Sequence, residues 1–236
     1  MPPTVILVRH AEALHNDYSL HDPELSELGR TQCRSLRKSL LKKVPQELDI
    51  GLILVSPMVR TIETALLAFG PLVEKGIPIR AHADWQENSA KPCDVGRPAA
   101  ELAARFPQVD FSGLDPVWPD KTSPAGARYA YTRQAIVARG ERALAELRGR
   151  PEKAVLVVSH SGFLRLGVTT HYFFNADYRV FDFVPSDQDR DGAGDDNDGK
   201  LWRLEQWEST KAGGLGWSWE KTVQLGEGLP DDLSAA

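Results

Sequence analysis

Two short apolar runs, each followed at once by a histidine, constrain the fold of this chain more than any other feature. Val5–Val8 stops at Arg9-His10, and Ala154–Val158 stops at Ser159-His160. Such runs, rich in β-branched residues, are typical of strands buried on both faces of a parallel sheet. Open α/β sheets bind ligands at the carboxyl ends of their strands, so we expect both histidines to lie at such an edge.

The other segments alternate in a way that favours an α/β fold. We expect a single three-layer α/β/α domain over residues 1–236, with a mostly parallel central sheet and a C-terminal edge hairpin. Helices are expected at 24–43, with Ser26 as a candidate N-cap, and after Ser56, with that serine as cap. Further helices are expected at 98–106, 129–147 and 163–172. Further strands are expected at 52–55 and 77–81, at 178–184 and 201–207 as the antiparallel hairpin, and at 217–225.

Three segments look irregular. Residues 89–126 are rich in Pro, Ala and Gly and are expected to form a lid insertion over one face of the sheet, where substrate selection usually resides. Residues 186–199 are expected to be a mobile acidic loop, and residues 226–236 a frayed tail. The spacing of Asp187, Asp189 and Asp191 leaves a calcium site in that loop as an open alternative to a solvated hairpin tip.

Charge and composition bound the function. The chain has 236 residues and a formal net charge of −5, which argues against a nucleic-acid partner. Six aspartates and one arginine between Ser186 and Gly199 account for all of it, so a pocket elsewhere can still attract anions. No apolar window reaches the length of a membrane span, and no secretory signal is visible. With only two cysteines, we expect a cytoplasmic protein.

The residues at the strand ends suggest phosphoryl chemistry. Arg9 supplies a planar cation suited to phosphate, and the neutral imidazole of His10 can attack phosphorus. Arg60 falls in the first turn of a helix that starts at a strand's carboxyl end, where an anion is favoured. Glu87 lies close to Trp85 in a loop, and a carboxyl group shielded in this way suits a general acid.

Together these motifs resemble the histidine phosphatase superfamily, in its phosphoglycerate-mutase-like branch. Arg9-His10-Ala11-Glu12 followed by Asn16 resembles the opening signature, with Ala11 where glycine is usual. Ser56-Pro57-x-x-Arg60-Thr61 resembles the second motif, and Ser159-His160-Ser161-Gly162 the last. The resemblance covers residues 4–184.

The resemblance implies a role for each matched residue, and it requires neither a metal nor another cofactor. His10 would be the nucleophile that forms a phosphohistidine, and Glu87 the general acid and then the base, with Glu12 and Asp94 as alternatives. Charged side chains and hydrogen-bond donors would bind the phosphate: Arg9, Asn16, Arg60, His160 and Ser161.

Three functions follow from these expectations. The first is a metal-independent phosphomonoesterase acting on a small phosphorylated metabolite. The second is a phosphoglycerate mutase, but such mutases carry a Gly-Leu-Asn-Lys type segment after the acid, whereas Glu87 is followed by Asn-Ser-Ala-Lys. The third is a phosphate-binding module, or a member of the fold reused for other chemistry. The sequence does not predict the oligomeric state.

Overall fold

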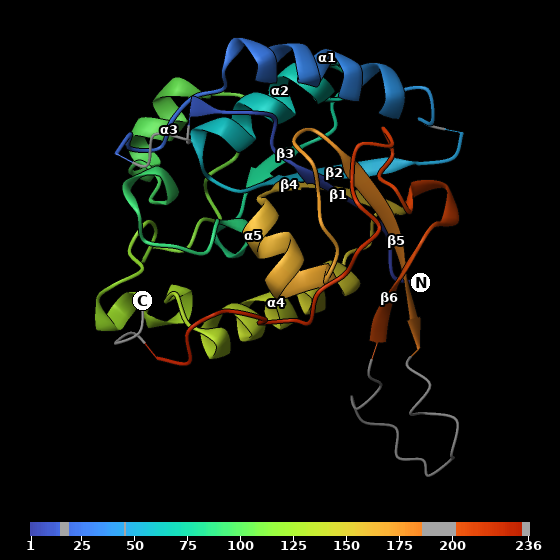
Figure 1. The fold of residues 1–236 in the computed structure, drawn as a ribbon. Helices are drawn as coiled ribbons and strands as arrows, with labels where there is room; N and C mark the ends of the chain where they lie inside the picture. Colours follow the sequence, from blue (N-terminus) through green and yellow to red (C-terminus); the bar gives the residue numbers. More distant parts are fainter. Residues whose placement is uncertain (15–18, 45, 186–201, 233–236) are drawn as a thin grey trace, which may run out of the picture.

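One mixed sheet of six strands forms the centre of the molecule (Figure 1). The structure is a computed structural model that describes residues 1–14, 19–44, 46–185 and 202–232. The strands, in the spatial order β3-β2-β4-β1-β5-β6, are β1 (Thr4–Arg9), β2 (Ile50–Val55), β3 (Ile79–Ala81), β4 (Ala154–Ser159), β5 (Tyr178–Pro185) and β6 (Trp202–Gln206). The first four are parallel, and β5 and β6 form the predicted antiparallel hairpin at one edge.

Helices cover both faces of this sheet. Figure 1 shows α1 and α2 on one face and α4 and α5 on the other. Their bounds are α1 (Glu27–Leu40), α2 (Val59–Glu74), α3 (Ala99–Arg105), α4 (Arg133–Arg148) and α5 (Ser161–Phe163). The predicted three-layer α/β/α class with a mostly parallel sheet is therefore confirmed, while the extent of the domain stays a prediction.

Alternate residues of β1 fill two separate cores. Ile6 and Val8 pack in the cluster that contains α1 and α2, and Val5 and Leu7 pack in the cluster that contains α4 and α5. All four are fully buried. A strand buried on both faces needs apolar residues at every position, which explains the unbroken run.

The helix α1 begins where its cap predicts. The Ser26 hydroxyl accepts a hydrogen bond from the Gly29 N–H at 3.0 Å, which satisfies one of the unpaired donors of the first turn. The apolar side chains of Cys33, Leu36 and Leu40 face the core.

The start of α2 differs from the prediction. Ser56 does not cap this helix, which begins at Val59. The capping group is the buried carboxylate of Asp22, whose Oδ1 accepts from the Val59 N–H at 3.0 Å and whose Oδ2 accepts from the Arg97 N–H at 3.2 Å. Asp22 has a positive φ of 43°, which aspartate tolerates better than most residues. One distant side chain thus fixes both α2 and the segment 89–126.

The helix after β4 is shorter than predicted. It starts at Ser161 and changes after Phe163 into a π-helical turn, η5 (Leu164–Thr169). η5 packs closely on α4, where a Cβ on Gly140 would lie 1.7 Å from the Gly167 carbonyl oxygen. Only glycine at position 140 allows this approach.

The C-terminal region contains the largest errors of the secondary-structure prediction. The expected strand over 217–225 is absent, and the segment forms a single bridge between His171 and Thr222. Residues 226–232 differ from the expected frayed tail, because Leu229 is buried and the Pro230 carbonyl accepts from the Arg133 N–H at 2.7 Å. Residues 233–236 and the acidic loop 186–199 lie outside the described residues.

The insertion 89–126 contains two short helical elements, η3 (Pro92–Asp94) and α3. The Ala81 N–H donates to the Asp110 carbonyl, and the Asp110 N–H donates to the Ile79 carbonyl, both at 2.9 Å. These hydrogen bonds connect the insertion to β3 at the sheet edge. Its action as a lid stays a prediction.

Candidate active site

The sheet brings the two predicted histidines together. β1 and β4 are neighbours with Arg9 opposite Ser159, and the His10 N–H donates to the Ser159 carbonyl at 2.9 Å. The ring centroids of His10 and His160 lie 5.1 Å apart at an interplanar angle of 61°. Both rings are buried, at 2% and 0% exposure.

Hydrogen bonds orient the ring of His10. Its Nδ1 lies 2.7 Å from the carbonyl oxygen of Ala11, which can only accept, so the Nδ1 atom carries the proton. Its Nε2 atom then has a lone pair, toward which the Arg60 Nε–H points at 3.3 Å. Nε2 is therefore the nitrogen with the electron pair needed for attack on an electrophile.

Arg60 is held against His10 by two further contacts. Its guanidinium donates to the Cys93 carbonyl at 2.6 Å and to Asp94 Oδ1 at 2.9 Å. The side chain is 1% exposed, so this ion pair is shielded from water. Asp94 also accepts from the Ser89 hydroxyl at 2.6 Å, and its carboxylate is thus engaged in orienting the arginine.

Arg9 is the last residue of β1 and directly precedes His10. Its guanidinium donates to the Phe173 carbonyl at 3.0 Å, and the Ser161 hydroxyl lies 3.5 Å from the same oxygen. Desolvation lowers the pKa of Arg9, while Tyr172 and Glu87 oppose that shift. Arginine stays protonated at neutral pH in spite of such a shift, so the site contains two guanidinium cations.

The surroundings of His160 favour its neutral form. Burial lowers its pKa well below the ordinary value, and the positive charge of Arg60 and the ring of His10 add to this effect. Its Nε2 lies 2.8 Å from the Ser56 hydroxyl, and its Nδ1 is buried without a hydrogen-bond partner among the described residues. The positive charge beside the two rings therefore comes from Arg9 and Arg60.

Glu87 reaches the site through the turn that follows His160. Its carboxylate accepts from the N–H groups of Phe163 at 3.0 Å, Gly162 at 3.2 Å and Asn88 at 2.9 Å. A Cβ on Gly162 would lie 2.5 Å from Glu87 Oε1, so glycine is needed here for the approach of this carboxylate.

The remaining predicted residues are placed less fully. Asn16 lies outside the described residues. Glu12, an alternative acid, donates its backbone N–H to Gln32 Oε1 at 2.8 Å, and its Oε2 is buried without a partner in the described part of the chain. The other alternative, Asp94, is paired with Arg60.

Sequence analysis missed two side chains that contact this cluster. Ser56 directly follows β2, which lies beside β4 in the sheet, so its position was a signal that it belongs to the same edge as the histidines. Lys121 is 3% exposed and donates to the backbone carbonyls of Glu87, Ser89 and Asp94. Nothing in its local sequence distinguishes it from a surface lysine.

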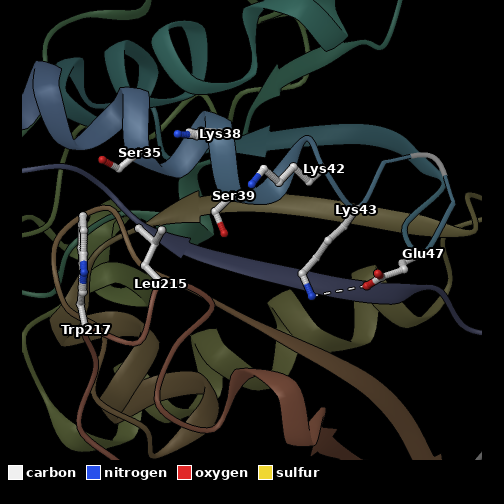
Figure 2. A pocket seen from close by; sticks show the side chains of 8 residues that line it. All are labelled: Ser35, Lys38, Ser39, Lys42, Lys43, Glu47, Leu215 and Trp217. Carbon is white, nitrogen blue, oxygen red and sulfur yellow. Dashed lines mark hydrogen bonds and ion pairs between the residues drawn. The ribbon is translucent and has the colours of Figure 1, made fainter.

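Two surface grooves lie apart from these residues. One, of about 580 Å³, lies between the C-terminal half of α1 and the loop of Leu215 and Trp217, and Figure 2 shows its lysines. The other, of about 460 Å³, is lined by the first 3₁₀ turn after β3, by α4 and by part of the insertion. Neither groove is lined by His10 or His160, so the candidate active site remains the group of side chains around these two histidines.

Within the described residues, no group of three or more His, Cys, Asp or Glu side chains is arranged to hold a metal ion. Residues 187–198, for which a calcium loop was left as an alternative, fall outside that part. Among the described helices, none combines the length and apolar character of a membrane span.

The sequence profile of the histidine phosphatase superfamily (branch 1) matches residues 5–181. The chain belongs to this superfamily. A probable phosphatase of Schizosaccharomyces pombe is 34% identical over 172 residues, covering 69% of this chain and 76% of that protein. Phosphoglycerate mutase-like protein 1 of Arabidopsis thaliana is 31% identical over 198 residues, covering 68% and 69%.

Solved structures share the fold of this histidine phosphatase superfamily member. The ecdysone phosphate phosphatase of Bombix mori, in complex with tungstate, aligns with a TM-score of 0.55 at 15% identity, over 76% of this chain and 89% of that one. A putative alpha-ribazole-5'-P phosphatase of Escherichia coli aligns with a TM-score of 0.52 at 17% identity, over 86% and 96%.

Proposed function

We propose that this protein is a metal-independent phosphomonoesterase that hydrolyses a small phosphorylated metabolite through a phosphohistidine. The observation that supports the proposal most is the position of His10 Nε2, which has a lone pair, 3.3 Å from a buried guanidinium and beside a second imidazole. Membership of the superfamily and the phosphatase-named relative support the same activity.

In the first step, the lone pair of His10 Nε2 attacks phosphorus, and the bond from phosphorus to the ester oxygen breaks. Arg9 and Arg60 stabilise the negative charge of the equatorial oxygens, with hydrogen bonds from Asn16, Ser161 and His160. Glu87, in its protonated form, gives its proton to the leaving oxygen.

In the second step, water attacks the phosphohistidine. Glu87 takes a proton from the water, the bond between phosphorus and Nε2 breaks, and inorganic phosphate leaves with His10 restored. Because the guanidinium groups supply the charge, we expect the reaction to need no metal.

The first test is hydrolysis of p-nitrophenyl phosphate in EDTA. We expect activity to survive chelation and to fall by at least about 1,000-fold in His10→Ala, since no other residue replaces the nucleophile. Lys153→Met, at an exposed residue paired with Asp49, is the matched control and should retain full activity. Equal rates for wild type and His10→Ala would contradict the histidine mechanism.

A phosphoglycerate mutase is the alternative that the Arabidopsis thaliana relative's name supports. A mutase shields its phosphohistidine from water and returns the phosphoryl group to the substrate. Incubation with 3-phosphoglycerate and a trace of the bisphosphate separates the two functions: we expect phosphate release, and faster isomer interconversion would favour the mutase. Absence of both reactions would favour a binding module.

A further inference from the structure

Lys121 is a buried ammonium group that no step above uses. It lies between α3 and the 3₁₀ turn η4 (Pro124–Tyr129), and 3% of its surface is exposed. Its Nζ donates to the Asp94 carbonyl at 2.6 Å and to the carbonyls of Glu87 and Ser89 at 2.8 Å each. An ammonium group has three N–H donors, so all three are used on one short stretch of backbone.

Both ends of this stretch send a side chain to the candidate active site. At one end, the carboxylate of Glu87 contacts the turn after His160. At the other end, the carboxylate of Asp94 pairs with Arg60, which in turn donates to His10 Nε2. Lys121 therefore binds the backbone of the proposed proton donor and of the residue that orients the phosphate-binding arginine.

The surroundings of Lys121 oppose its burial as a cation. Burial lowers its pKa to about 7, and Arg139 and Arg60 push in the same direction, against Asp94 and Glu87. An apolar side chain would avoid this cost but would leave three buried carbonyls unpaired. From α4, Arg139 also reaches this stretch, where it donates to the Asn88 side chain (Oδ1, 2.6 Å) and not to the three carbonyls that Lys121 binds.

We propose that Lys121 is a positioning residue of the phosphatase site: its three hydrogen bonds set where Glu87 protonates the leaving oxygen and where Asp94 holds Arg60. The inference rests on the proposed function, in which Glu87 is the general acid. A lysine that only stabilised the fold would not act through Glu87, and this difference can be measured.

The test compares two leaving groups in Lys121→Met and Glu87→Gln. Phenolate is a poor leaving group that needs a proton, whereas p-nitrophenolate leaves readily without one. We expect both variants to lower kcat/KM for phenyl phosphate by about 100-fold, the lower range of general-acid contributions, and for p-nitrophenyl phosphate by less than about 10-fold. Acting through Glu87, Lys121→Met should add less than about 3-fold in a Glu87→Gln background.

Leu102→Ala is the matched control, because Leu102 is fully buried in α3 of the same insertion. It should lower the free energy of unfolding and affect both substrates equally. Lys121→Gln keeps two donors and serves if Lys121→Met does not fold. Lys121→Gln should also lower kcat/KM more for phenyl phosphate than for p-nitrophenyl phosphate, but by a smaller factor than Lys121→Met.

The proposal would be overturned if Lys121→Met lowered kcat/KM equally for both substrates; Lys121→Gln takes its place if Lys121→Met does not fold. It would also be overturned if the loss of kcat/KM in the double variant equalled the product of the losses in Lys121→Met and Glu87→Gln. Equal losses in Glu87→Gln would remove Glu87 as the acid and this inference with it. The phosphohistidine proposal is tested separately, because it fails only if activity persists in His10→Ala.

Discussion

At the scale of single residues, Lys121 links the stability of the protein to pH. The pKa of this lysine falls from 10.5 to about 7 on burial, with desolvation as the main cause and Arg139 next. Between these values the unfolded chain keeps the proton of Lys121, whereas the folded chain binds it only in part. Stability therefore rises with pH across this window and is lost as pH falls toward 7, by at most about 1.4 kcal/mol per pH unit.

The measurement is urea unfolding of wild type and Lys121→Met at pH 7, 8 and 9. Methionine carries no proton, so we expect the difference in unfolding free energy, wild type minus variant, to increase by about 1 to 3 kcal/mol from pH 7 to pH 9. The charged groups that face Lys121 are Arg139, Asp94, Glu87 and Arg60, and they are unchanged in the variant. A difference that stays constant over this range would contradict the prediction.

The predictability of individual site residues from sequence depended on where they lie. His10, Arg60 and His160 follow or adjoin apolar strands, and this position, together with the family resemblance, predicted that they lie at one edge of the sheet. The charge of His160 was not predictable, because it depends on full burial next to Arg60. Lys121 was not predictable either, since only the folded insertion places its ammonium group beside the carbonyls of 87–94.

At the scale of elements, α2 depends on a cap supplied from outside its own sequence. Asp22→Ala removes the acceptor of both the Val59 and Arg97 N–H groups. We expect the free energy of unfolding to fall by about 1 to 3 kcal/mol, the range for a lost cap and unpaired buried donors. Arg60 is the second residue of α2, so inorganic phosphate should also inhibit the variant less well.

Two measurements check this prediction, urea unfolding and the inhibition constant of phosphate. Ser26→Ala is the control, because it removes the cap of α1, which contains none of the proposed phosphate-binding residues. It should lower stability by about 1 kcal/mol and leave phosphate inhibition unchanged. Unchanged stability in Asp22→Ala would show that the carboxylate does not cap α2.

The beginning or end of a helix was predicted well where the local sequence pattern determines it, and poorly where tertiary contacts determine it. Ser26 caps α1 as expected, because cap and helix are adjacent in sequence. The cap of α2 comes from a residue 37 positions away, and the Ser56 hydroxyl serves His160 instead. The conversion of α5 into a π-helical turn accompanies close packing on α4, which local periodicity does not reveal.

At the scale of the whole molecule, the buried carboxylate of Asp177 attaches the C-terminal segment to the sheet. It accepts from the N–H groups of Tyr178, Leu215 and Trp217 and from the Ser218 hydroxyl. The expected strand over 217–225 was wrong: Asp177 holds Trp217 and Ser218 through side-chain contacts, which have no periodic signature.

Asp177→Asn tests this attachment. The amide nitrogen would face buried donors, each costing about 1 to 3 kcal/mol when unpaired, so we expect the free energy of unfolding to fall by at least about 2 kcal/mol. Limited proteolysis should cut residues 208–222 faster than in wild type. Asp49→Asn, at an exposed ion pair, is the control and should change stability by less than about 1 kcal/mol. Wild-type protection of this segment in Asp177→Asn would contradict the prediction.

The neighbouring positions of β1 and β4 have a consequence for how this molecule can change. Adjacent strands of any sheet are about 4.8 Å apart, and the separation of 5.1 Å between the two imidazoles reproduces that repeat. The separation of the two rings thus follows from the pairing of β1 and β4, whereas the stretch 87–94 supplies Glu87 and holds Arg60 through Asp94. A change in that stretch can therefore displace the proposed proton donor and the arginine while the two histidines keep their spacing.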